Sequence, residues 1–165
     1  MNRSAAAGDF DGDGDLDLAV GDGGDAVQLA VLLNQGDGTF SAPVLSQVEV
    51  SVPECGRPTC VFSFSPNRLW SADLDGDPFA DLVIGTVGPG GGGVPGGEAL
   101  RLVSALGNGD GTFLSPDGSL RAGFSPHVVL GVVVADFDED GDEDVLAAGD
   151  EGTWLYPNDG SGLFP

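Results

Sequence analysis

The apolar residues of this 165-residue chain fall into short runs that recur at a nearly constant interval. Three of these runs each follow directly on an acidic nine-residue segment, and they cover residues 18–20, 82–84 and 145–147. A second set of runs follows at residues 28–34, 99–106 and 153–158. Apolar runs of this length, bounded by turn residues, predict buried β-strands.

One run, EALRLVSAL at residues 98–106, is also compatible with a helix. Its alignment with QLAVLLN at residues 28–34, which is richer in strand-forming residues, favours a strand. Each second run leads into a glycine-rich turn that ends in a phenylalanine: Phe40, Phe113 and Phe164. We therefore predict an all-β fold of three tandem propeller-like blades of antiparallel strands, an incomplete or open β-propeller with no significant helix.

These blades define a single repeat domain over residues 1–165, with units at about 4–64, 65–126 and 127–165. The last unit is expected to be truncated, because the chain stops directly after Phe164. The glycine run at 88–97 is expected to lengthen a hairpin in the second unit alone. Three blades cannot close a ring. The chain is therefore either a fragment of a longer propeller or a subunit that self-associates through open blade edges.

The acidic segments are DFDGDGDLD, DLDGDPFAD and DFDEDGDED, at residues 9–17, 73–81 and 136–144. Carboxylates at positions 1, 3, 5 and 9 converge only if the backbone curls around a point, and calcium accepts six to eight such oxygens. The carbonyl at position 7 is expected to join them. The predicted metal ligands are Asp9, Asp11, Asp13, Asp15 and Asp17; Asp73, Asp75, Asp77, Phe79 and Asp81; and Asp136, Asp138, Asp140, Asp142 and Asp144.

Position 6 distinguishes the three segments. Gly14 and Gly141 allow the sharp turn there, whereas Pro78 fixes φ near −65° and forbids a positive value. We expect Ca²⁺ at the first and third segments, and weak, altered or no binding at the second. An EF-hand does not fit, because position 12 lies inside a predicted strand instead of holding a glutamate.

The charge of the chain supports cation binding. Its formal net charge is −22, and the three segments hold 16 of the 27 acidic residues. Like charges at this density disfavour a compact loop unless something neutralises them. The same charge repels nucleic acid and anionic membranes, so neither is an expected partner. A content of 41% hydrophobic residues argues against a disordered acidic tail.

No run is long enough to span a bilayer, and the first ten residues lack the apolar core of a signal peptide. A mature or excised chain, or a leader outside it, is therefore expected. Cys55 and Cys60 flank a short loop in an otherwise thiol-free chain. A local disulfide would indicate an oxidising, extracellular setting, and a pair of free surface thiols is the alternative.

The pattern of apolar strand, DFDGDGDLDLAV, strand and GDGTF resembles the FG-GAP or VCBS repeats of integrin-α-like β-propellers. The resemblance covers nearly the whole chain. It implies a calcium ion in the hairpin between the first two strands of a blade, an extracellular or cell-surface location, and a role in adhesion or ligand binding.

We expect a non-catalytic, calcium-stabilised structural protein that self-associates into a larger assembly or filament. The alternative is an adhesion module, excised from a longer propeller, that binds an extracellular protein or a glycan. A third hypothesis is that the chain is an accessory domain of a hydrolase. The only histidine, His127, begins an apolar run and is expected to be structural. Three aromatic residues could line a sugar site: Trp70, Trp154 and Tyr156. The favoured interpretation is that they pack between blades.

Overall fold

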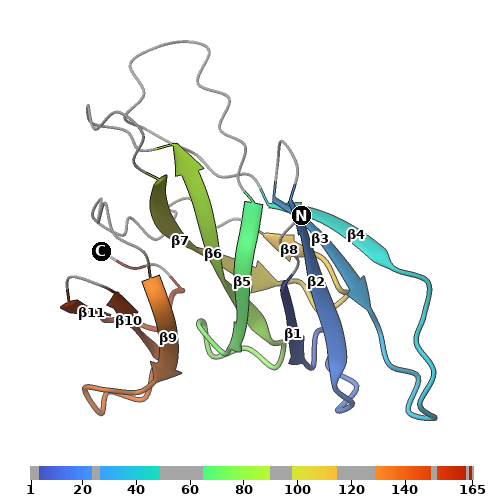
Figure 1. Cartoon of the computed structure of the whole chain (residues 1–165). Coiled ribbons are helices and arrows are strands. Elements are labelled where there is room, and N and C mark those ends of the chain that lie inside the picture. The colour runs from blue at the N-terminus through green and yellow to red at the C-terminus, as the bar shows by residue number, and fades with distance from the viewer. Residues whose placement is uncertain are drawn as a thin grey trace.

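The computed structural model describes residues 4–23, 27–48, 65–89, 98–114, 129–149, 152–162 and 164. Every regular element in this part of the chain is a β-strand, and none of it is helical. The strands form three separate antiparallel sheets that stand side by side (Figure 1). The predicted all-β fold of open, propeller-like blades is thus confirmed.

Blade one contains β1 (Ser4–Gly8), β2 (Asp17–Gly23), β3 (Val27–Leu32) and β4 (Val44–Val48). Blade two contains β5 (Ser65–Ala72), β6 (Asp81–Pro89), β7 (Glu98–Gly107) and β8 (Phe113–Leu114). Blade three contains β9 (Val129–Ala135), β10 (Asp144–Gly149) and β11 (Gly152–Tyr156). Within each blade the strands pair in chain order.

The segment that was compatible with a helix forms β7, the longest strand of the described chain. Successive side chains of β7 lie on opposite faces of blade two. Both faces are apolar, because blade one covers one of them and blade three covers the other. The proposed disulfide between Cys55 and Cys60, most of the glycine run, and His127 lie outside the described residues. The boundaries of the three units remain predictions.

The blades have the same register, which places equivalent residues on equivalent faces. Ala19 pairs with Ala6 and Val31 in blade one, as Val83 pairs with Trp70 and Ser104 in blade two. In blade three the corresponding pairs join Leu146 to Val133 and Leu155. Because side chains alternate across a strand, each set lies on one face of its sheet.

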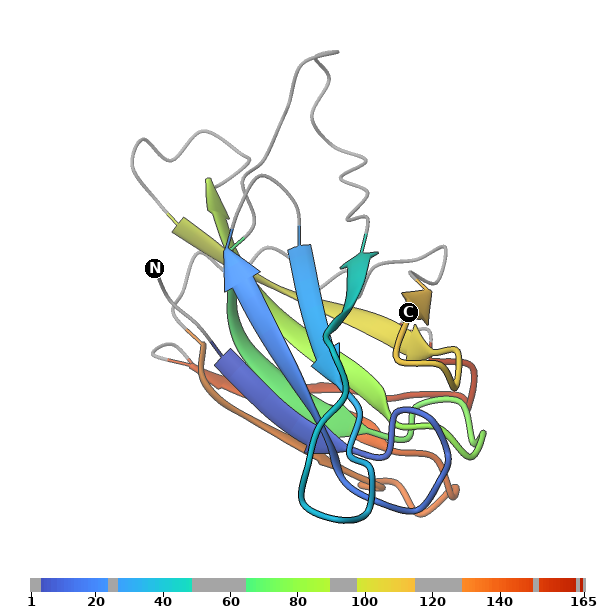
Figure 2. The same ribbon diagram turned by 90° about the vertical axis from the view of Figure 1, so that its right-hand side faces the viewer.

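The hydrophobic core lies between blades, whose sheets stack face to face (Figure 2). One cluster joins blades one and two, and includes an edge-to-face contact of Phe10 with Phe113 at 5.5 Å between ring centroids. A second cluster joins blades two and three around Leu74, Val83, and Val145. Trp70 and Tyr156 pack against this second cluster, as expected for aromatic residues between blades, whereas the half-buried Trp154 belongs to neither cluster.

Hydrogen bonds also cross between blades. From blade two to blade one, Ala80 N donates to the carbonyl of Asp9 at 2.8 Å, and Leu69 N donates to Ser4 Oγ at 2.7 Å. From blade three to blade two, Asn158 Nδ2 donates to the carbonyl of Leu74 at 2.7 Å. The stack is therefore held by polar contacts as well as by apolar burial.

Candidate metal centre

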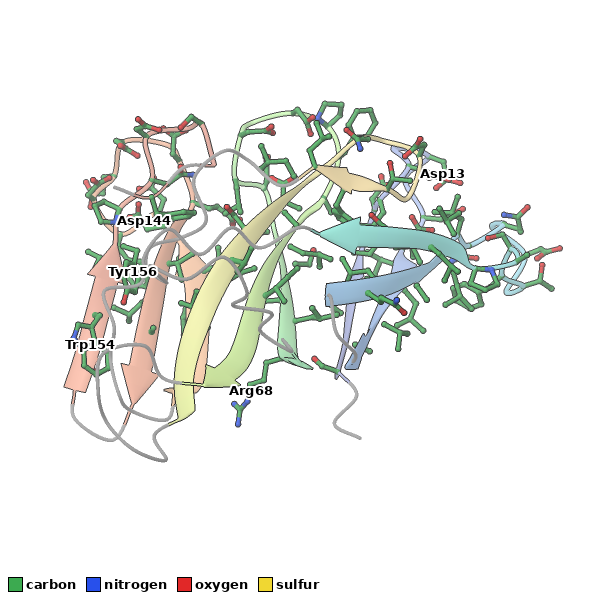
Figure 3. All side chains as sticks on the ribbon, turned by 90° about the horizontal axis from the view of Figure 1, so that it is seen from above. Asp13, Arg68, Asp144, Trp154 and Tyr156 are labelled. Atoms are coloured by element: carbon green, nitrogen blue, oxygen red, sulfur yellow. The ribbon has the colours of Figure 1, made fainter. Side chains whose placement is uncertain are left out.

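Each acidic segment forms the loop between the first two strands of its blade. We call these loop one (residues 9–17), loop two (73–81) and loop three (136–144), and number the residues of each loop 1 to 9. The three loops lie along one edge of the molecule, where Asp13 and Asp144 are seen, while Arg68 lies at the opposite edge (Figure 3). This arrangement concentrates negative charge along a single edge.

The position-1 carboxylate organises the turn of each loop. Asp9 Oδ1 accepts from Gly12 N at 2.7 Å and its Oδ2 accepts from Gly14 N at 2.9 Å. Asp136 accepts the equivalent pair of bonds in loop three. Asp73 accepts from Gly76 N at 2.9 Å, but Pro78 has no N–H to supply the second bond. The proline therefore removes one of the bonds that close the loop.

Positions 3 and 5 repeat a smaller motif, in which a carboxylate oxygen accepts the N–H two residues on. In loop one, Asp11 accepts from Asp13 N at 3.2 Å and Asp13 accepts from Asp15 N at 2.9 Å. Loops two and three contain the same bonds. Such turns are a common use of aspartate in tight loops, and here they order the backbone from position 3 to position 7 of each loop.

The position-9 aspartates are buried and form the base of each loop. Asp17 Oδ2 accepts from Phe10 N at 2.8 Å, and its Oδ1 accepts from Asn34 N at 2.7 Å in the glycine-rich turn. Asp81 and Asp144 accept the equivalent bonds. Each of these carboxylates thus joins the loop to the turn that follows the third strand of its blade. A carboxylate oxygen has two lone pairs, so these bonds still leave acceptor capacity.

Backbone conformation separates the loops. Position 6 is left-handed in loops one and three, with φ of 91° at Gly14 and 105° at Gly141. Position 4 is left-handed in all three loops, and in loop three it is occupied by Glu139, whose φ is 65°. The sequence indicated the need for glycine at position 6, but not the strain at Glu139.

The side chains at position 7 cover a glycine of the following turn. A Cβ at Gly36 would lie 2.8 Å from Asp15 Oδ2, and one at Gly160 would lie 2.8 Å from Asp142 Oδ2. In blade two the ring of Phe79 occupies this place, over Gly109. Sequence reasoning assigned only the carbonyl of position 7 to the loop, and it missed this packing role of the side chain.

The geometry brings three carboxylates together in each loop, with one oxygen from each within 4.8 Å of the others. The three sets are Asp9, Asp11 and Asp13; Asp73, Asp75 and Asp81; and Asp136, Asp138 and Asp144. Positions 1 and 3 therefore contribute in every loop, joined by position 5 in loop one and by position 9 in the others. Asp17, Asp77 and Asp140 lie in their loops but outside these sets. These sets could hold a metal ion.

Desolvation, together with repulsion between carboxylates, raises the pKa of several aspartates in the loops. Burial raises the pKa of Asp81 to about 6, against the opposing effect of N–H groups from Gly107 and Leu74. Desolvation, followed by repulsion from neighbouring carboxylates, raises the pKa of Asp75 and Asp138. The same two effects raise the pKa of Asp11 and Asp142. A nearby cation would favour the ionised form of such desolvated and crowded carboxylates.

Sequence comparison identifies the repeat. The profile of the FG-GAP-like repeat matches the chain twice, over residues 9–84 and 73–147, and each match begins at the first aspartate of a loop. The chain belongs to the FG-GAP-like repeat family, as its resemblance predicted. A search of the curated proteins found no match for it.

Among solved structures, one similar chain is a lectin from Agrocybe aegerita, described as specifically recognising non-reducing terminal N-acetylglucosamine. The alignment has 23% identity and a TM-score of 0.32, and it covers 96% of the present chain. The present chain spans about half of that lectin, at 49% of its length. A likeness of this degree carries no conclusion about sugar binding. In the part of the chain that is described, no helix is long and apolar enough to cross a membrane.

Proposed function

We propose that this chain is a non-catalytic, extracellular structural module whose aspartate loops bind calcium and which associates with other copies. The observation that carries the proposal is the threefold repetition of one loop geometry, each copy with carboxylate oxygens within 4.8 Å of one another. Repeats of this family often bind calcium, and the family is typical of extracellular proteins.

The donor sets fit calcium by their chemistry. Every side-chain ligand available in the loops is a carboxylate oxygen, the hard donor that calcium prefers, and the loops contain no histidine or cysteine. Asp9, Asp11 and Asp13 would hold the ion in loop one, and the corresponding sets would hold it in loops two and three. A bound divalent cation would offset the desolvation and the mutual repulsion that raise the pKa of Asp11, Asp75 and Asp138.

A non-catalytic role agrees with the environment of Asp81, which has the largest pKa shift among the described carboxylates. A pKa of about 6 suits a general acid or base, but this side chain is fully buried. Both of its oxygens accept backbone N–H groups of the blade. Burial inside the loop accounts for this shift, which supports a structural role for Asp81.

The expected energetic contribution follows from mass action. A site filled at a free calcium concentration about tenfold above its Kd adds about 1.4 kcal/mol to the free energy of unfolding. Loops one and three together would add about 3 kcal/mol. For a domain of this size that corresponds to a rise in Tm on the order of 6–12 °C. Calcium would then supply a sizeable part of the stability of a typical domain.

Calorimetric titration with calcium, combined with thermal unfolding in calcium and in chelator, tests the proposal. We expect two sites of higher affinity, and a Tm that falls in chelator. Asp11→Asn and Asp138→Asn should each remove one site, while Asp37→Asn, the same change at an exposed turn, should remove none. Absence of calcium binding, or an equal loss in the Asp37→Asn control, would contradict calcium binding by the loops.

A further inference from the structure

Each blade presents two different faces to its neighbours. The following face contains the position-2 loop residue and the mid-strand residues that pack on the next blade, such as Phe10, Ala19 and Val31 of blade one. The preceding face packs on the blade before it and includes the phenylalanine of the glycine-rich turn, such as Phe113 of blade two. Blade two uses both faces, and the apolar residues of its two inter-blade contacts come from equivalent positions.

The following face of blade three carries the same apolar positions, but they are exposed. Phe137 is 42% exposed, whereas its equivalents Phe10 and Leu74 are each 1% exposed. Val133 and Leu155 on the same face are 55% and 46% exposed. The residues equivalent to Leu155 are Val31 and Ser104, and both are fully buried by the next blade.

The preceding face of blade one also exposes apolar residues that are buried at the equivalent positions of the other two blades. Phe40 is 47% exposed, whereas its equivalents Phe113 and Phe164 are each 6% exposed. Leu18 and Val20 lie on this face and are half-buried, although their equivalents in blade two, Leu82 and Ile84, are fully buried. Leu45 on β4 extends the exposed apolar surface.

We propose that the following face of blade three binds the preceding face of blade one in a second copy of this chain, by the contact that already joins blades one to two and two to three. The inference rests on the self-association proposed above and names the two surfaces. The two faces are complementary halves of one contact, which the chain forms twice within itself. A contact between two different faces is heterologous, so it extends from copy to copy and gives a ring or a filament.

The contact between blades one and two indicates the polar part of this interface, whereas between blades two and three the equivalent carbonyl, of Leu74, accepts from Asn158 Nδ2 instead. The carbonyl of Phe10 accepts from Gly111 N of the next blade at 3.3 Å. The equivalent residues on the two outer faces are Phe137 and Gly38. We therefore expect the carbonyl of Phe137 to accept from Gly38 N of the second copy. The contact would place loop three of one copy beside loop one of the next, and so continue the row of loops.

Net charge sets the conditions of assembly. Two copies with a net charge of −22 each repel one another, and this repulsion is screened beyond about 8 Å at physiological ionic strength. Association through apolar faces should thus strengthen when sodium chloride is raised. It should strengthen further in calcium, which would neutralise the adjacent loops.

Analytical ultracentrifugation of the full chain in calcium, over a range of protein concentrations, tests the proposal with two blocked variants. Leu155→Arg places a charge on the following face, and Phe40→Arg places one on the preceding face. Each is expected to weaken self-association by about thirtyfold or more, the effect of losing a central interface residue. Leu114→Arg, the same change at a 59% exposed residue of blade two that lies on neither outer face, should associate like the wild type.

The decisive measurement mixes the two blocked variants. Each variant retains one intact face, so the mixture should form a one-to-one dimer and nothing larger. Calorimetry must show that both variants still bind calcium, which separates this inference from the metal proposal. A monomeric wild type, a mixture that stays monomeric, or a blocked variant that assembles normally would overturn the head-to-tail contact. Self-association that both variants leave intact would overturn this geometry while leaving the proposed function standing.

Discussion

Loops one and three share their main hydrogen bonds but have different surroundings. Both have glycine at position 6 and the same two bonds to the position-1 carboxylate, and in both the position-9 aspartate accepts the position-2 N–H. Their position-2 side chains nevertheless differ, because Phe10 is 1% exposed and Phe137 is 42% exposed. The difference in exposure comes from the neighbouring blade, because blade two covers Phe10. The hydrogen bonds of a loop are thus determined within its own blade, and the burial of its position-2 side chain is determined by the next blade.

Truncating the position-2 residue should produce the largest difference between loops one and three. Phe10→Ala removes a buried aromatic side chain and its contact with Phe113, and should lower the free energy of unfolding by about 3–5 kcal/mol. Phe137→Ala should change it by no more than about 0.5 kcal/mol in dilute, monomeric protein. Urea unfolding of both variants in chelator measures the difference. Equal losses would mean that Phe137 is covered in the monomer.

Removing the position-9 carboxylate should affect both loops equally. Asp17→Ala and Asp144→Ala each leave two backbone N–H groups without an acceptor, and each should cost about 2 kcal/mol or more even in chelator. Asp37→Ala, at an exposed turn, is the control. A loss that is seen only in calcium would show that these residues act as ligands and contribute little as acceptors.

Replacing the proline of loop two tests why that loop differs from the other two. Pro78→Gly restores an N–H for the second oxygen of Asp73 and permits a positive φ. Calcium affinity at loop two should therefore rise by about tenfold, the effect of one hydrogen bond in free energy. Pro78→Ala restores the N–H alone and should give a smaller gain. Calorimetry in the background of Asp11→Asn with Asp138→Asn isolates this loop, and an unchanged affinity would contradict the explanation.

Relieving the strain at position 4 of loop three is expected to have the smallest effect. Glu139 has a positive φ where loops one and two have glycine, and such a conformation costs a non-glycine residue about 1 kcal/mol. Glu139→Gly should stabilise the chain by roughly that amount in thermal unfolding with chelator. Glu139→Gln removes the charge and keeps the strain, so an equal gain there would show that charge is responsible.

The architecture could be predicted from the sequence because each blade repeats one apolar pattern. The apolar runs that follow the loops form β2, β6 and β10, as predicted. Comparison with residues 28–34 also correctly predicted that β7 is a strand. What one unit could not show was the contact between units. A large apolar residue inside an acidic loop is unexplained until the next blade covers it, although the recurrence of Phe10, Leu74 and Phe137 at position 2 was a usable signal.

The candidate site was also only partly predictable. Aspartate spacing indicated the carboxylates that converge, and Pro78 was correctly recognised as a departure from the glycine of the other loops. The position-9 aspartates were predicted only as ligands, because their bonds run to turns far along the chain, such as from Asp17 to Asn34. The sequence does not reveal which backbone groups a distant turn will present.

The dependence of Phe10 on Phe113 has a consequence for biosynthesis. The N-terminal part of the chain leaves the ribosome first. Blade one can therefore form its sheet and its loop hydrogen bonds before Phe113, the aromatic partner of Phe10, has been synthesised. During that interval Phe10 is exposed to solvent, and every added blade covers the previous one while exposing a new apolar surface. Folding should therefore advance one blade at a time, with the most recently synthesised blade as the region vulnerable to proteases and to misassociation.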